Sequence, residues 1–203
     1  GIDLTPAMLE QARKNQAAQG LTNITWKQGD VLPLPFPDAS FSIVTSRFAF
    51  HHFLDPLAVL KEMKRVAEPG GKVMFVDRAP APDRADAFNR AEKLRDPSHV
   101  RAMPVDEHKS LYAKAGLPEP RLTWYRLESE MEALIARSFP NPGDDDKIRA
   151  LFRASLADDR LGIPIRAEGT TIHYAYPVAV LVAERPRPRP GPHLSLSATR
   201  SRV

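Results

Sequence analysis

The segment that most constrains the fold is a run of four apolar residues, Val73-Met74-Phe75-Val76, which ends at the acid Asp77. A strand with one face in water alternates apolar and polar residues, whereas a strand covered on both faces is apolar throughout. This run is therefore typical of a central, parallel strand with helices on either side. The chain is expected to belong to the α/β class.

Strand and helix signals alternate along the first 77 residues. Thr5 is a favourable N-cap residue and Pro6 suits the first position of a helix, and Asp55-Pro56 repeats this signal. Expected strands end near Asp3, Gln28, Thr45 and Asp77. This rhythm predicts a Rossmann-like open, mostly parallel sheet with helices on both faces.

Glycine and proline mark where the first two helices are expected to end. Gly20 fits the left-handed residue just after a helix. Pro69-Gly70-Gly71 is expected to stop the second helix before the apolar strand begins. The Pro-rich residues 32–38 between the two helices are expected to form a rigid loop.

The second half is expected to complete the same domain, over residues 1–184. Its β-branched and aromatic residues 173–182 predict a last, antiparallel strand. We interpret residues 130–156 as a lid inserted over the substrate. The expected helices cover residues 84–95, 105–115, 131–139 and 145–156.

The formal charge of +4 arises at one end of the chain. Residues 185–203 hold five of the 29 basic residues and none of the 25 acidic ones, so 24 basic residues face 25 acidic ones elsewhere. The folded part is not basic, and no nucleic-acid partner is expected for it. This Pro- and Arg-rich tail is predicted to be disordered, because it has few apolar residues to bury. A tail that binds RNA or a membrane is the alternative.

Other compositional features exclude whole classes of site. Cysteine is absent, which excludes disulfides, thiol nucleophiles and cysteine zinc ligands. The longest apolar run, residues 178–183, is far shorter than the ~20 residues that span a bilayer, and no start resembling a signal peptide is present. A cytoplasmic protein with no membrane partner is expected. No metal site is expected either, because the adjacent His51 and His52 should point apart.

Polar residues follow the ends of the expected strands, where ligands bind in open parallel sheets. Because right-handed crossovers place these ends on one edge, we expect the polar side chains to lie there together. Acids in such places need partners, so a bound polyol or amine is one interpretation, and capping of nearby helices or turns is the other. Capping is the favoured interpretation for Asp77 and the less favoured one for Asp3. The residues at this edge are Asp3, Asp30, Thr45-Ser46-Arg47 and Asp77-Arg78.

Four successive segments resemble motifs of the class I S-adenosylmethionine-dependent methyltransferases. The similarity is to the small-molecule type related to the ubiquinone and menaquinone C-methyltransferases. It covers about the first 77 residues and carries the motifs in the family's order. The segments are residues 1–9, 29–41, 51–56 and 62–71.

The resemblance implies S-adenosylmethionine as cofactor and assigns residues to it. Asp3 would hold the ribose hydroxyls, and Asp30 would approach the adenine amino group with the Val31 backbone beside the ring. Since neighbouring parallel strands lie about 4.8 Å apart, one nucleoside can reach across two strand ends. The remaining expected cofactor-binding residues are Leu4, Met8, Ser46 and Arg47.

The sequence departs from the family's pattern in two respects. The family's first strand and glycine-rich turn are expected N-terminal to Gly1, and the sheet is expected to lack that strand between those ending at Asp3 and near Thr45. That turn closes over the methionine part of the cofactor in the family. Ser42 also replaces an aspartate, and Ala67-Glu68 replaces Leu-Lys, both at scaffold positions.

The expected function is methyl transfer from S-adenosylmethionine to a small molecule by in-line displacement, which depends mainly on positioning. If the acceptor must lose a proton, His51 or His52 would be the first candidate base. The alternative is that each packs or caps at the following helix. Alternative functions are a non-catalytic, truncated fragment of such an enzyme and an NAD-type oxidoreductase, which also carries an acid after its second strand.

Overall fold

The apolar run expected to be a central strand lies in β4 (Ala67–Arg78) of the computed structural model, which describes residues 1–188. β4 pairs in parallel with β3 (Phe41–Arg47) and antiparallel with β7 (Thr171–Glu184). β7 also pairs antiparallel with β5 (Arg121–Glu130) and with β6 (Ile165–Glu168). The strand order is β3-β4-β7-β5, so only β7 runs against the others. The α/β class and the antiparallel last strand are confirmed.

Helices cover both faces of this sheet, as expected. Side chains of β4 and β7 point alternately into two apolar clusters, one containing Phe75 and Leu181 and the other Val76 and Tyr176. The first cluster is closed by α2 (Pro56–Val66) and α4 (Val105–Lys114). The second is closed by α3 (Ala85–Arg95), α5 (Met131–Ala136) and α6 (Asp144–Ser155). No helix among residues 1–188 is both long enough and apolar enough to cross a membrane.

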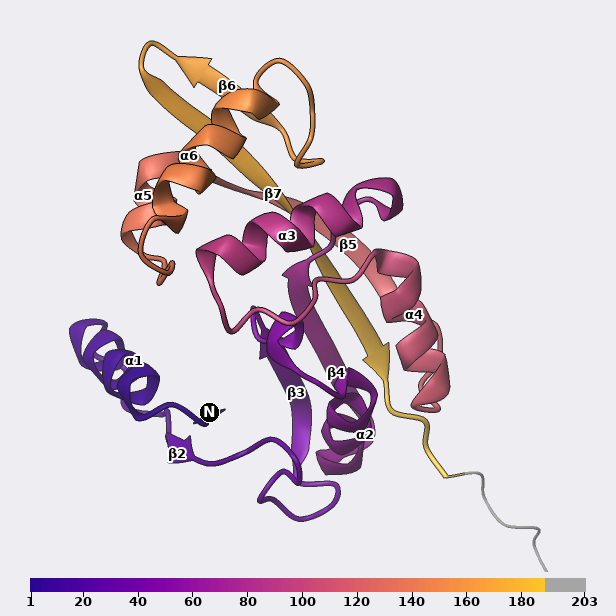
Figure 1. The fold of residues 1–203 in the computed structure, drawn as a ribbon. Helices are drawn as coiled ribbons and strands as arrows, with labels where there is room; N and C mark the ends of the chain where they lie inside the picture. Colours follow the sequence, from indigo (N-terminus) through magenta and orange to yellow (C-terminus); the bar gives the residue numbers. More distant parts are fainter. Residues whose placement is uncertain (189–203) are drawn as a thin grey trace, which may run out of the picture.

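The N-terminal elements form a separate small unit (Figure 1). β1 (Ile2–Asp3) and β2 (Lys27–Gln28) pair in parallel, and α1 (Pro6–Ala18) connects them. Within the described residues, no strand pairs with β1 on its other side or with the outer edge of β3. Ile43 of β3 is consequently 60% exposed.

Local signals placed most helix ends well. The Asp55 side chain accepts a hydrogen bond from the Ala58 N–H at 2.9 Å, and Gly20 has the expected positive φ of 64°. By contrast, Thr5 occupies the N-cap position of α1 without a side-chain bond to the helix. β2 is shorter than the strand expected over residues 24–28.

Pro69-Gly70-Gly71 does not separate α2 from β4, which corrects the sequence interpretation. α2 ends earlier, at Val66, and β4 already pairs with β3 at Ala67, so the three residues lie in an irregularity of the ladder. A Cβ on Gly71 would lie 3.0 Å from the carbonyl oxygen of Ser42. Glycine is therefore required by the close approach of the two strands.

The expected boundary between domain and tail also needs correction at Arg185. Its N–H donates to the Gly71 carbonyl at 2.8 Å, and its guanidinium donates to the carbonyl oxygens of Arg65, at 2.9 Å, and Ala67. These bonds attach Arg185 to the C-terminal end of α2 and to β4. The prediction of disorder for the rest of the tail falls mainly on residues 189–203, which lie outside the described residues.

Candidate functional site

The site begins at the C-terminal end of β1, where Asp3 is half-buried. One carboxylate oxygen of Asp3 accepts a hydrogen bond from the Thr5 N–H at 2.8 Å. Thr5 precedes α1, so this bond forms a turn before the helix and does not cap the first helical turn. Among residues 1–188, no hydrogen-bond donor reaches the second oxygen, which leaves it able to accept from a ligand.

Asp30, just after β2, has a similar arrangement but is exposed. One oxygen accepts from the N–H groups of Val31, at 2.6 Å, and Leu32, at 3.1 Å. The Val31 N–H is therefore already engaged, and Val31 packs its side chain against the first apolar cluster. A ring beside Val31 would meet backbone and apolar surface, while the other Asp30 oxygen could accept from an amino group.

The other expected cofactor-binding residues differ in exposure. Leu4 and Met8 are 64% and 58% exposed, which is high for apolar side chains. Ser46 is half-buried in β3, and Arg47 at the strand's end holds its guanidinium 4.6 Å from the centre of the Phe48 ring. Phe48 has a φ of +52°, which is uncommon for a non-glycine residue and marks a sharp change of direction after β3.

His51 and Asp77 form a buried pair rather than facing an opening. His51 lies in the short η1 (Phe50–His52) and is 3% exposed. Its Nδ1 lies 2.8 Å from both oxygens of Asp77, and its Nε2 lies 3.5 Å from the Arg78 guanidinium. Burial alone would raise the pKa of Asp77, but the hydrogen bond and charge of His51 outweigh it and lower that pKa. Asp77 is thus an ionised structural partner, in agreement with the capping interpretation.

His52 is the more accessible of the two candidate bases. Its side chain is 32% exposed, and its Nδ1 lies 3.2 Å from the Ser98 carbonyl oxygen. Its Nε2 is 3.9 Å from an Asp96 oxygen. Burial, followed by the charge of His51, lowers the pKa of His52 below its ordinary value of 6.5. His52 is therefore neutral at pH 7, as a proton acceptor must be.

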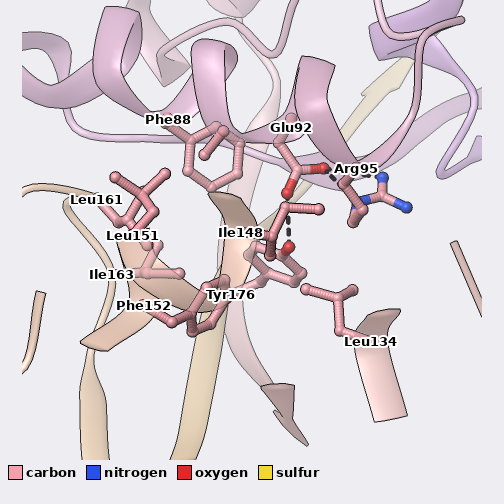
Figure 2. A pocket seen from close by; sticks show the side chains of 11 residues that line it. Phe88, Glu92, Arg95, Leu134, Ile148, Leu151, Phe152, Leu161, Ile163 and Tyr176 are labelled. Atoms are coloured by element: carbon pink, nitrogen blue, oxygen red, sulfur yellow. Dashed lines mark hydrogen bonds and ion pairs between the residues drawn. The ribbon is translucent and has the colours of Figure 1, made fainter. Parts of the chain in front are cut away.

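A second buried group, centred on Glu92 of α3, adjoins this pair (Figure 2). One Glu92 oxygen accepts from the Tyr176 hydroxyl at 2.5 Å, and the other binds Arg95 at 2.9 Å and also Arg78. Burial opposes ionisation of Glu92, but the charges of Arg78 and Arg95 lower its pKa. Because Arg78 contacts His51 as well, one connected network joins η1, β4, α3 and β7.

This network borders a small apolar cavity between α3 and the two helices expected to form a lid. The cavity has a volume of about 10 Å³, which is room for about one water molecule. It is a gap in the core and is too small for a substrate. Its apolar lining includes Phe88, Leu134, Ile148, Phe152, Leu161 and Ile163.

A third histidine, His99, packs beside His51 with ring centres 5.3 Å apart. Both hydrogens of the Asn89 amide nitrogen go to backbone carbonyls, so the Asn89 oxygen is an acceptor and the His99 Nε2, 2.7 Å away, carries the hydrogen. Burial lowers the pKa of His99 to about 4. Within residues 1–188, no group of three or more His, Asp or Glu side chains is arranged to hold a metal ion.

Sequence reasoning missed Glu92 and Tyr176. The spacing of Glu92 and Arg95 in a helix predicts a pair of the kind seen on many exposed helix surfaces. Tyr176 belongs to a strand that signals only burial. Nothing local indicates that these residues, 84 positions apart in sequence, share a hydrogen bond.

Comparison with known proteins supports the resemblance. A family model described as "Methyltransferase domain" matches residues 1–75. The "Uncharacterized methyltransferase YcgJ" of Bacillus subtilis (strain 168) is 35% identical over 179 residues, which are 86% of this chain and 70% of that protein. The crystal structure of the B. subtilis YcgJ protein matches with a TM-score of 0.79 and 26% identity, over 93% of this chain and 82% of that one. A demethylmenaquinone methyltransferase of Deinococcus radiodurans is 44% identical over 80 residues, 39% of this chain and 33% of that enzyme.

Proposed function

Because the chain belongs to the class I S-adenosylmethionine-dependent methyltransferases, we propose that Asp3 and Asp30 hold the nucleoside of S-adenosylmethionine while the methyl group passes to a small-molecule acceptor. The family's reaction is methyl transfer. The role of individual residues and the class of acceptor are the proposal. The relatives named above support the methyl-transfer reaction over hydride transfer to a nicotinamide.

The free oxygen of Asp3 is the observation that carries the proposal. A half-buried carboxylate with a single protein donor has lost part of its hydration without full replacement. Two ribose hydroxyls would supply the missing donors. The turn to Thr5 fixes the direction of the carboxylate, so little side-chain freedom would be lost on binding.

The neighbouring residues fit the rest of a nucleoside. The free oxygen of Asp30 suits the exocyclic amino group of adenine, and Val31 offers apolar surface beside the ring. Leu4 and Met8 present exposed apolar side chains that a ligand can cover. Ser46 and Arg47 end β3 at the sheet edge where ligands bind in this fold.

S-adenosylmethionine, when bound, supplies a methyl group on a sulfonium, a good leaving group. The chain's own residues then need mainly to orient the acceptor and exclude water. The network of His51, Asp77, Arg78 and Glu92 holds η1 and α3 rigidly at the end of β4. His52 accepts the proton where an acceptor must lose one, because it is neutral and partly exposed.

Charge and composition support a small acceptor in the cytoplasm. The chain before residue 185 has 24 basic and 25 acidic residues, so it offers no excess positive charge for nucleic acid. α5 and α6, beside α3, are the proposed lid over the acceptor.

Calorimetric titration with S-adenosylhomocysteine tests the roles of the acids, using the chain together with any coding sequence that precedes Gly1. Asp3→Ala should weaken binding at least about tenfold, because a hydrogen bond to a charged group is worth roughly 1.5–3 kcal/mol and 1.4 kcal/mol is a factor of ten. Asp83→Ala, which removes an exposed acid of η2 (Pro82–Arg84), is the matched control and should leave affinity unchanged.

Three outcomes would contradict parts of the proposal. Unchanged affinity in Asp3→Ala removes Asp3 from the site. A loss of about 1 kcal/mol in stability with near-normal affinity supports capping instead. Binding without methyl transfer to any small acceptor favours the non-catalytic alternative.

A further inference from the structure

The far edge of the sheet is formed by β5, a strand with one side open. All ten residues of β5 pair with β7 in continuous register, and no strand within the described residues pairs with its other edge. β5 contains neither Pro nor Gly, the residues that commonly interrupt such edges. A long, regular, open edge is a template for pairing with another strand.

Exposed aromatic side chains accompany this edge. Trp124 is 51% exposed on the α2–α4 face, and Tyr125 is 36% exposed on the other face. An open hollow of about 410 Å³ lies on the Trp124 side and also touches Arg126. Large aromatic residues and arginine are enriched where proteins associate.

The charges of β5 are arranged in a self-complementary order. Arg121 and Arg126 precede Glu128 and Glu130 along the strand. Among residues 1–188, none of these four side chains has an ion-pair partner, although 18 ion pairs are present in the same part of the chain. An antiparallel second copy of β5 would bring the basic part of one strand to the acidic part of the other.

Symmetry restricts the possible registers. A twofold axis perpendicular to the sheet makes the two strands antiparallel and keeps each face on the same side, so opposed side chains must lie on the same face. The axis then passes through a residue. An axis at Arg126 or Glu128 opposes like charges, and an axis at Tyr125 places Glu128 opposite Leu122. An axis at Leu127 places Arg126 of each copy opposite Glu128 of the other.

We propose that two copies of this chain associate through β5, antiparallel and centred on Leu127, with two Arg126–Glu128 pairs across the interface. The sheet then continues from one copy into the other. β5 is at the opposite edge of the sheet from β3, so the interface leaves Asp3 and Asp30 accessible. The proposal does not depend on the proposed function.

Sedimentation equilibrium of the full chain over a range of concentrations tests this proposal. Arg126→Glu should weaken dimerisation at least tenfold, because each pair becomes two opposed acids. The double variant Arg126→Glu/Glu128→Arg restores opposite charges and should recover dimerisation to within about threefold of the unchanged chain. Arg121→Glu makes the same charge change on the same strand but lies beyond this register, and it should leave the dimer unaffected.

Circular dichroism of each variant establishes that it is folded. A chain that is monomeric at the highest attainable concentration refutes the proposal and indicates that the β5 charges prevent edge pairing. A dimer that Arg126→Glu does not weaken, or that the double variant does not recover, refutes the β5 register.

Discussion

Tyr176→Phe tests whether the buried network on Glu92 stabilises the fold. The change removes only the hydroxyl that donates to Glu92 at 2.5 Å and keeps the ring, which packs against Phe88 and Tyr174. A hydrogen bond to a buried charged group contributes about 1.5–3 kcal/mol, so the free energy of unfolding should fall by that amount. For a domain of this size the expected fall in Tm is roughly 3–12 °C.

Tyr174→Phe is the matched control, because it removes a hydroxyl two residues away on the same strand. The Tyr174 hydroxyl accepts from Arg137 at 3.2 Å, a longer bond to a partly exposed group. Its loss should cost less than about 1 kcal/mol. Urea unfolding at pH 7 measures both variants, and an unchanged m-value shows that the unfolding transition itself is the same.

The pH dependence of the difference provides a second test. The Arg78 and Arg95 charges hold the pKa of Glu92 below 4.5 despite its burial. A carboxyl with a lowered pKa in the folded state stabilises the protein fully above its unfolded pKa, and this contribution is lost as pH falls through the folded value. The cost of Tyr176→Phe should therefore be constant from pH 7 to about 5 and shrink below pH 4.5. Equal destabilisation in both variants, or a cost that grows on acidification, would refute the reasoning.

Two further predictions concern the tail and His52. Removal of residues 189–203 should leave Tm unchanged within error, whereas Arg185→Ala should cost about 1–2 kcal/mol in urea unfolding, because it removes guanidinium bonds to the carbonyls of Arg65 and Ala67; equal effects would contradict this. If His52 is the proton acceptor, the rate of methyl transfer should fall as pH decreases below 6.5, since a protonated imidazole cannot accept a proton. That fall should be absent in His52→Gln, and its persistence there would exclude His52 as the titrating group.

Local signals were sufficient for the order of elements and for most helix ends. Asp55 caps α2 as its sequence predicts, and Gly20 and Gly116 have the positive φ expected after a helix. Pro69-Gly70-Gly71 was misinterpreted because its role is set by pairing with β3, which no local pattern reports. The resemblance over the first 77 residues, and its order of motifs, allowed the family to be identified before the structure.

The candidate site could be predicted only in part, and the two acids Asp3 and Asp77 illustrate why. Each ends a strand and is followed by a turn, so sequence pattern alone treats them alike. In the structure, Asp77 is 1% exposed, and its oxygens are occupied by the His51 ring and by the N–H groups of His51 and Arg78. Asp3 is half-buried and has one donor, the Thr5 N–H. The number of donors around a carboxylate is a tertiary property, and it separates an acid that supports the fold from one that can still bind a ligand.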